Sequence, residues 1–285
     1  MPSLLFSEIR EMYRQDASAF DSSSVDMLGA EAPKKQSSGC VFRIRREMTS
    51  SENRRKKKSL AERIERVSSR IALPDPQQRV LEATRDTFTW VTKHTQTWNE
   101  HWQEEGRPQA YEPFPPYAYF QDVFDLLDMQ RVNFFEKSRD MMISWACVAY
   151  LTLQAMKTPF RGVLMQTQKE DKVVQLIEYA KCLYRNQPNW LQKAFPLDKP
   201  IEQQASTRLE FANGSYLAGI PGGADQIRSF HPWGYLNDES SFQPEAGHCY
   251  NEALAVVKGK IIFNSSAGPG WYADVRHDII RGEEE

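Results

Sequence analysis

The stretch VNFFEKSRDMMIS, residues 132–144, joins an apolar segment to a polar turn and the start of a second apolar segment. The aromatic, β-branched run at 132–136 is typical of a short buried strand. The run from Ile143 to Met156 suits a buried helix and is too short to span a bilayer. Lys137 and Ser144 lie at the two ends of the turn. A strand, a polar turn and a helix N-terminus in this order form a possible phosphate site, because the first backbone N–H groups of a helix have no partner within it.

Strands and helices are predicted to alternate on both sides of this stretch. Asn213-Gly214 lies between two of the strands and indicates a two-residue hairpin turn. The alternation predicts an α/β domain over residues 105–285, with a mainly parallel, P-loop NTPase-like sheet flanked by helices. Ligands of such sheets bind beyond the carboxyl ends of the strands. The further predicted strands are 162–166, 208–211, 215–218, 233–237 and 260–264, and the predicted helices are 120–129, 143–156 and 169–185.

The first 104 residues differ in character from the rest. Residues 1–72 combine serine runs with a basic cluster at 54–58 and have low hydrophobicity, which predicts a flexible basic arm. The arm is either a contact for DNA phosphates or simply a solvated tail. Helical spacing from Gln77 to Gln103 predicts a helical lead-in at 73–104.

Composition and charge limit the class of protein. The 285 residues are 40% hydrophobic and 26% charged, which is ordinary for a globular protein. The net charge of −2 gives no overall attraction to nucleic acid, so any contact with DNA requires a local patch. The four cysteines lack zinc-ligand spacing, and the N-terminus does not resemble a signal peptide. We expect an intracellular protein that is not in a membrane.

The turn at 137–144 departs from the usual phosphate-loop pattern GxxxxGK[ST]. Ser144 occupies the position of the hydroxyl that binds magnesium. Ile143 stands where the lysine belongs, while Lys137 and Met142 stand at the two glycine positions. On its own the segment is only a weak match.

Two later segments carry the other groups that a nucleotide site needs. GYLNDESS, residues 234–241, is a predicted strand that ends in Asp238 and Glu239. Such a pair suits a magnesium-positioning acid and a base that polarises water. The alternative is an ordinary strand followed by an acidic loop. IIFNSSAG, residues 261–268, brings two hydroxyl groups to the same sheet, although by itself it is also just a loop.

Together and in this order, the three segments resemble the ATPase domain of bacteriophage large terminases, which drive viral DNA into a capsid. A lysine shifted to the front of the phosphate loop is frequent in that family. The resemblance implies that Lys137, with Ser138 and Arg139 beside it, contacts the phosphates of ATP. It also implies that Ser144 binds Mg²⁺.

The same resemblance assigns roles to the other segments. It implies Asp238 as the metal-positioning acid and Glu239 as the catalytic base. Ser265, Ser266 and Ala267 match the family's coupling motif, which links hydrolysis to DNA movement. Gln121 is a candidate for adenine recognition, with a plain helix-surface glutamine as the alternative. Arg228 is a candidate arginine finger for a neighbouring subunit, with a surface arginine as the alternative.

The resemblance further implies double-stranded DNA, a portal protein and a small terminase subunit as partners of a homo-oligomeric ring in the host cytoplasm. Two features depart from the family. Met142 places a side chain where the loop normally leaves room for phosphate. No segment supplies the clustered carboxylates of a nuclease, so we expect no DNA cleavage from this chain alone. Two other functions stay open, a helicase-like DNA repair ATPase and a non-catalytic DNA-binding or assembly component.

Overall fold

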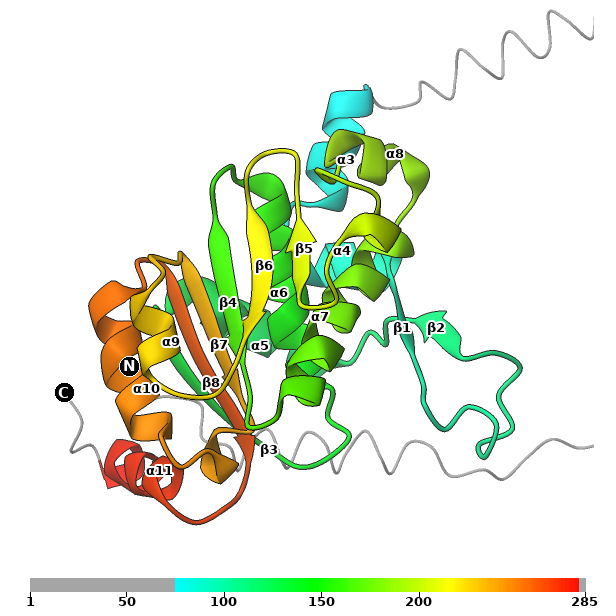
Figure 1. The fold of residues 1–285 in the computed structure, drawn as a ribbon. Coiled ribbons are helices and arrows are strands. Elements are labelled where there is room, and N and C mark those ends of the chain that lie inside the picture. Colours follow the sequence, from blue (N-terminus) through cyan, green and yellow to red (C-terminus); the bar gives the residue numbers. More distant parts are fainter. Residues whose placement is uncertain (1–74, 282–285) are drawn as a thin grey trace, which may run out of the picture. The chain divides into compact units, whose positions relative to one another are not determined.

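Six strands form one sheet within residues 75–281, the part of the chain that the computed structural model describes (Figure 1). All neighbouring strands run parallel except β5 and β6, which are antiparallel. The prediction of a mainly parallel sheet is confirmed. The predicted arm at 1–72 lies outside the described residues. The strands, in their order across the sheet, are β3 (Val132–Lys137), β8 (Lys260–Ser266), β7 (Gly234–Asp238), β4 (Gly162–Gln166), β6 (Tyr216–Ile220) and β5 (Arg208–Glu210).

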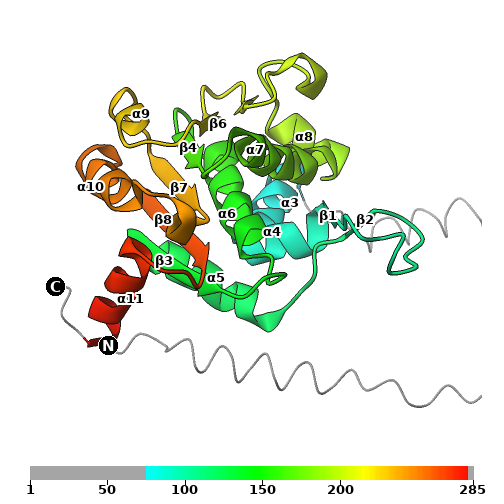
Figure 2. The same ribbon diagram turned by 60° about the horizontal axis from the view of Figure 1, so that its bottom comes forward.

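Helices cover both faces of the sheet (Figure 2). One face packs against α5 (Ala118–Met129), α6 (Ile143–Lys157) and α7 (Glu170–Arg185), and the other against α9 (Asp225–Arg228), α10 (Ala246–Val256) and α11 (Trp271–Arg281). Within residues 75–281, no helix has both the length and the apolar character needed to cross a bilayer.

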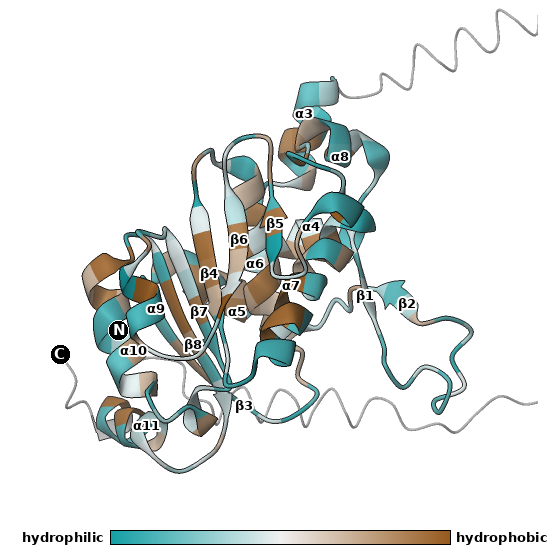
Figure 3. Ribbon diagram, viewed as in Figure 1, coloured by the Kyte–Doolittle hydropathy of each residue, from teal (hydrophilic) through white to brown (hydrophobic). Residues whose placement is uncertain are grey.

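Each central strand is apolar on both sides because each side meets a helical layer. In β7, Leu236 belongs to the core beneath α6, whereas Tyr235 belongs to the core beneath α10. β8 divides in the same way between Ile262 and Phe263. Successive side chains of a strand point to opposite faces, so a strand covered on both faces reads as a continuous apolar run. The apolar colour of these strands is visible in Figure 3.

The segment before the sheet is less helical than predicted. It contains α3 (Pro76–Ala83) and α4 (Thr87–His94), followed by the short antiparallel pair β1 (Gln96–Trp98) and β2 (Tyr111–Pro113). Asp86 begins α4, and its Oδ1 accepts a hydrogen bond from the backbone N–H of Thr89 at 2.6 Å. The predicted helix therefore breaks at an N-cap and ends at His94. Trp98 lies on a strand, with its ring edge-on to that of Trp145.

The turn between β5 and β6 also differs from the prediction. Its loop spans three residues, 212–214, because Phe211 and Ser215 pair and Gly214 adopts φ 82°. A third loop residue in the left-handed region is the usual solution for three-residue hairpins. Asn213 is held away from a two-residue turn by its Nδ2, which donates to the carbonyls of Ala155 and Met156 at the end of α6. Two short helices, α8 (Asn189–Ala194) and η1 (Ile201–Gln203), lead into β5.

Gly219 allows α7 to approach the sheet, and its replacement tests that packing. A Cβ atom at Gly219 would lie 2.1 Å from Cγ1 of Val173 on α7. We expect Gly219→Ala to lower the free energy of unfolding by about 1–3 kcal/mol, the usual range for overpacking a core. Urea denaturation measures the loss. In the control Gly222→Ala, the new Cβ would meet nothing closer than the Thr167 carbonyl oxygen at 3.8 Å, so an equal loss there would contradict the account.

Candidate nucleotide site

The carboxyl ends of four parallel strands meet at one edge of the sheet. Lys137, the last residue of β3, pairs in register with Ser266 of β8. Asn264 of β8 pairs with Asp238, the last residue of β7. Gln166 ends β4 beside Asn237. Segments that are far apart in the sequence therefore bring their polar ends together at the edge where α/β sheets bind ligands.

The turn between β3 and α6 is strained. Asp140 has φ 65° and Met142 has φ 52°, both in the left-handed region without being glycine. Each such residue costs on the order of 1–3 kcal/mol and persists only where its surroundings enforce it. Met142 is the N-cap of α6, and its side chain packs partly against the core. The glycine conformation of the usual pattern is thus kept at Met142 although the glycine is absent.

Ser144, Asp238 and Asn264 form a connected cluster behind this turn. The hydroxyl of Ser144 donates to Oδ1 of Asp238 at 2.9 Å. Nδ2 of Asn264 donates to the same carboxylate oxygen at 2.6 Å and to the Ser144 hydroxyl at 3.0 Å. Oδ1 of Asn264 is buried and has no hydrogen-bond partner within residues 75–281. The cluster joins the first turn of α6 to the ends of β7 and β8.

Burial raises the pKa of the Asp238 carboxyl. Removal from water is the largest effect, and it outweighs the opposing effects of Lys137 and of the hydrogen bonds from Ser144 and Asn264. Asp238 is only 8% exposed. A buried carboxylate that is imperfectly compensated favours either a proton or a bound cation.

The raised pKa gives a testable effect on stability. Because the folded state holds the Asp238 proton more tightly than the unfolded state, wild-type stability falls as pH rises through the folded pKa. Asp238→Asn lacks this loss and can keep both hydrogen bonds. Without Mg²⁺ at about pH 7.5 we expect its Tm to exceed wild type by about 2–4 °C, the shift that ~1 kcal/mol gives a domain of this size. The difference should shrink toward about pH 4, where an ordinary Asp protonates. Thermal melts at both pH values decide, and a gap independent of pH would contradict the account.

Glu239 follows β7 in a strained conformation. It has φ 57° and begins the short helix η2 (Ser240–Phe242). Its side chain is half-buried and borders two cavities. The tight turn directs Glu239 out of the strand at the point where the adjacent Asp238 remains buried.

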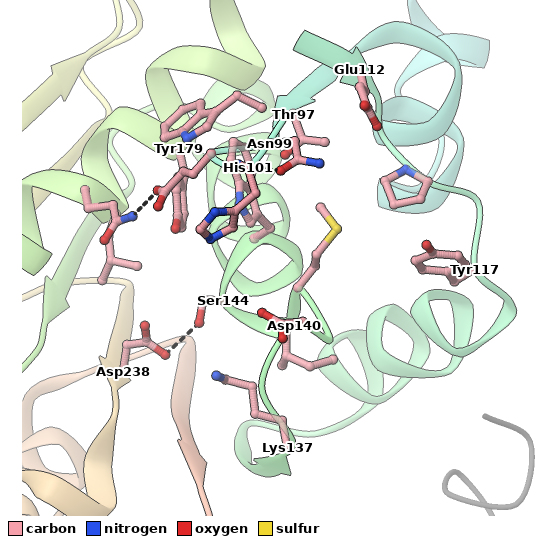
Figure 4. Close-up of a pocket in the computed structure, with 18 of the residues that line it drawn as sticks. Thr97, Asn99, His101, Glu112, Tyr117, Lys137, Asp140, Ser144, Tyr179 and Asp238 are labelled. Atoms are coloured by element: carbon pink, nitrogen blue, oxygen red, sulfur yellow. Dashed lines mark hydrogen bonds between the residues drawn. The ribbon is translucent and has the colours of Figure 1, made fainter. Parts of the chain in front are cut away.

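Two cavities share the Lys137–Glu239 edge. The larger holds about 660 Å³, and Lys137, Ser144 and Asp238 converge on one end of it (Figure 4). Its other walls come from Tyr117, from Tyr179 of α7, and from the β1 strand with the turn after it, including His101. The second cavity holds about 440 Å³ and is bordered by residues from the three predicted segments: Lys137, Arg139, Asp140, Glu239, Phe242, Ser266 and Ala267.

Several predicted residues lie elsewhere. Gln121 lines neither cavity, and its Nε2 donates to Asp125 of its own helix at 2.8 Å. Ser138 is exposed and also lines neither. Arg228 is exposed on α9, where it pairs with Glu252 at 2.6 Å and Asp225 at 3.3 Å. The structure does not bring these three side chains to the Lys137–Glu239 edge within one chain.

The predicted coupling residues connect β8 to the turn after Glu239. Ser265 is fully buried, and its Oγ accepts a hydrogen bond from the backbone N–H of Ser241 at 3.0 Å. The Ser241 hydroxyl donates to the carbonyl of Ser266 at 3.1 Å. The end of β8 is thus attached to the segment that carries Glu239.

Sequence reasoning missed two parts of the site. Asn264 was part of the quoted segment at 261–268, but strand position alone does not show that its amide meets Ser144 and Asp238. The wall formed by β1 was missed because helical spacing at 77–103 concealed the strand. Trp98, Trp145 and Tyr179 form an aromatic cluster there, and the last two rings stack with centroids 4.0 Å apart.

Comparison with known proteins gives the fold. No protein-family model matches the sequence. No curated protein matches it either. Among solved structures, the large terminase of bacteriophage HK97 superposes with a TM-score of 0.52 at 9% identity, over 70% of this chain and 42% of that one.

Two other solved structures superpose less well. The ATPase domain of the Thermus phage P74-26 large terminase gives a TM-score of 0.41 at 11% identity, over 56% of this chain and 69% of that one. A large terminase from a thermophilic bacteriophage, in complex with ADP, gives 0.34 at 15% identity, over 52% and 36%. This chain spans less than half the length of the HK97 protein. Residues 75–281 therefore have the α/β fold found in a phage large terminase.

Proposed function

We propose that this chain is the ATP-hydrolysing motor domain of a phage or prophage large terminase, which couples hydrolysis of Mg-ATP to the movement of double-stranded DNA. One observation carries the proposal. Lys137, Ser144, Asp238 and Glu239 come from separate segments of a terminase-like fold and border one cavity. Those residue types are what a magnesium-bound triphosphate requires.

The residues of the cluster fit a magnesium ion. Mg²⁺ prefers oxygen ligands and is commonly bound by one or two carboxylates together with substrate phosphates. Ser144 and Asp238 supply a hydroxyl and a buried carboxylate within 2.9 Å of each other. The unpartnered Oδ1 of Asn264 adds a buried oxygen beside them. The chemistry that bound Mg²⁺ supplies is neutralisation of phosphate charge.

The side chains around the cluster divide the remaining work. Lys137 places a positive charge at the cavity end, where it attracts the β- and γ-phosphates, and Arg139 assists from the neighbouring cavity. Ser138 contacts the phosphates from the same turn. Glu239 accepts a proton from the attacking water, and its position between the two cavities gives it access to that water.

Loss of phosphate is transmitted through β8. Ser265 and Ser266 bind the segment after Glu239 through Ser241. Ala267 borders the phosphate-side cavity together with Ser266. A change around Glu239 therefore reaches the end of β8 directly.

Other roles depend on partners or on movement. Arg228 acts on the ATP of the next subunit in a homo-oligomeric ring, since its exposed side chain lines neither cavity of its own chain. For Gln121 to recognise adenine, its side chain must leave Asp125. The ring engages double-stranded DNA, a portal protein and a small terminase subunit in the host cytoplasm.

Purified protein mixed with ATP and linear duplex DNA tests the proposal. We expect hydrolysis that requires Mg²⁺ and increases with DNA, without separation of a forked duplex. Unwinding of the fork would instead assign the fold to a helicase-like ATPase. Absence of hydrolysis with Mg²⁺, DNA and partner subunits present would assign it to a non-catalytic assembly role.

A further inference from the structure

A chain of buried hydrogen bonds runs beneath the Glu239 turn. Nε2 of Gln243 donates to Oδ1 of Asn237 at 2.8 Å, and Nδ2 of Asn237 donates to the hydroxyl of Tyr235 at 2.8 Å. The Tyr235 hydroxyl then donates to Oε1 of Gln166. Nε2 of Gln166 donates to the carbonyls of Pro221 at 2.6 Å and Gly223 at 3.0 Å. Every donor points the same way along the chain.

The first end of this chain holds the Glu239 turn. Besides its bond to Asn237, Nε2 of Gln243 donates to the carbonyl of Asp238 at 2.7 Å. The Ser240 hydroxyl donates to Oδ1 of Asn237 at 2.8 Å. These bonds bracket Glu239 on both sides and stabilise its left-handed conformation at φ 57°.

The other end holds the glycine-rich segment that leads to Arg228. Pro221 and Gly223 lie immediately before α9, whose last residue is Arg228. A second bond joins the same two regions, since Oε2 of Glu245 accepts from the backbone N–H of Ala224 at 3.1 Å. The turn after β7 and the segment before α9 are therefore connected twice.

Burial makes the hydrogen-bonded chain an all-or-none structure. Gln166, Tyr235 and Asn237 are fully buried, and Gln243 is 9% exposed. A buried polar group that loses its partner is costly, and bonds aligned in one direction strengthen one another. A displacement at one end therefore disturbs the links in the middle rather than leaving them unchanged.

We propose that Gln166 and Tyr235 are positioning residues of a relay between the Glu239 turn and the segment that presents Arg228. The relay rests on the proposed function only for its consequence in a ring. There, a change at a subunit's own ATP moves the arginine that it offers to its neighbour. The relay itself is a property of the single chain.

Hydrogen–deuterium exchange on the full chain tests the relay without using ATPase activity. Tyr235→Phe removes one oxygen from the middle of the relay and touches neither end. We expect amides of both 221–228 and 239–245 to exchange about tenfold faster, as loss of ~1.4 kcal/mol of local stability would give, and Gln166→Met to do the same. Exchange that changes in only one of the two segments, or in neither, would overturn the relay.

Two matched controls exist in the chain. Tyr184→Phe removes a buried hydroxyl that donates to the Phe195 carbonyl at 3.0 Å. Gln192→Met removes an amide that donates to the carbonyls of Arg185 and Gln187, as Gln166 does to its two. Both controls should change exchange only near their own sites.

Steady-state kinetics separates the relay from the motor. We expect Tyr235→Phe to lower kcat about fivefold with KM for ATP within about twofold, and to lower it less in an Arg228→Ala background. Losses that simply multiply would show that the relay does not act through Arg228. A chain that never hydrolyses ATP yet shows linked exchange would contradict the proposed function and leave the relay standing.

Discussion

Replacing Glu239 with glutamine is expected to lower kcat for ATP hydrolysis by about 10³-fold, within the usual range for loss of a general base. The amide has the size of the carboxylate but cannot accept a proton from water. Glu239 borders both cavities, whereas Lys137, Ser144 and Asp238 hold the triphosphate end. Binding of Mg-ATP should therefore stay within about twofold of wild type.

The measurement pairs steady-state kinetics with nucleotide titration. Glu210→Gln is a suitable control, because Glu210 lies on the edge strand β5 and pairs with Arg208 at 2.9 Å, away from both cavities. It should leave kcat unchanged. A Glu239→Gln chain that hydrolyses ATP at even a tenth of the wild-type rate would remove Glu239 from the catalytic role.

Arg228→Ala is expected to reduce the rate of the assembled ring by about 10³-fold, the lower end of the range for an arginine finger. Arg228 borders neither cavity of its own chain and is held at the surface by Glu252 and Asp225. Its contribution must therefore come from a neighbouring subunit. Arg208→Ala, which removes another exposed, ion-paired arginine, is the control and should have little effect.

Mixing the two inactive variants distinguishes action in trans from a local defect. In rings assembled from Glu239→Gln and Arg228→Ala chains, some interfaces combine an intact Glu239 with an intact Arg228. We expect an equimolar mixture to recover a measurable part of wild-type ATPase activity. A mixture as inactive as its components would show that Arg228 does not act across the interface.

Local patterns were sufficient to predict most of the fold. The strands at 132–136 and 162–166 and the helices at 143–156 and 169–185 are confirmed to within a few residues. These segments are long apolar runs or amphipathic stretches, and their burial on both sheet faces enforces what the pattern indicates. The helix predicted through Trp98 was wrong, because a strand pairing with residues 111–113 replaced local helical spacing.

The site was predictable only in part. Lys137, Ser144, Asp238 and Glu239 border one cavity because they end or follow parallel strands, which topology brings to one edge. The role of Asn264 depends on contacts to residues 120 and 26 positions away, and the Gln166 relay crosses 55 positions to Pro221. No local pattern contains such pairings. Gln121 and Arg228 came from resemblance alone, and their chemical roles remain predictions.

The most direct test is a crystal structure of the chain with Mg²⁺ and a non-hydrolysable ATP analogue. The account predicts the triphosphate in the cavity between the 137–144 turn and β7, with Ser144 and Asp238 facing one metal ion and Glu239 facing the γ-phosphate. A nucleotide bound elsewhere, or a metal ion distant from Asp238, would contradict it.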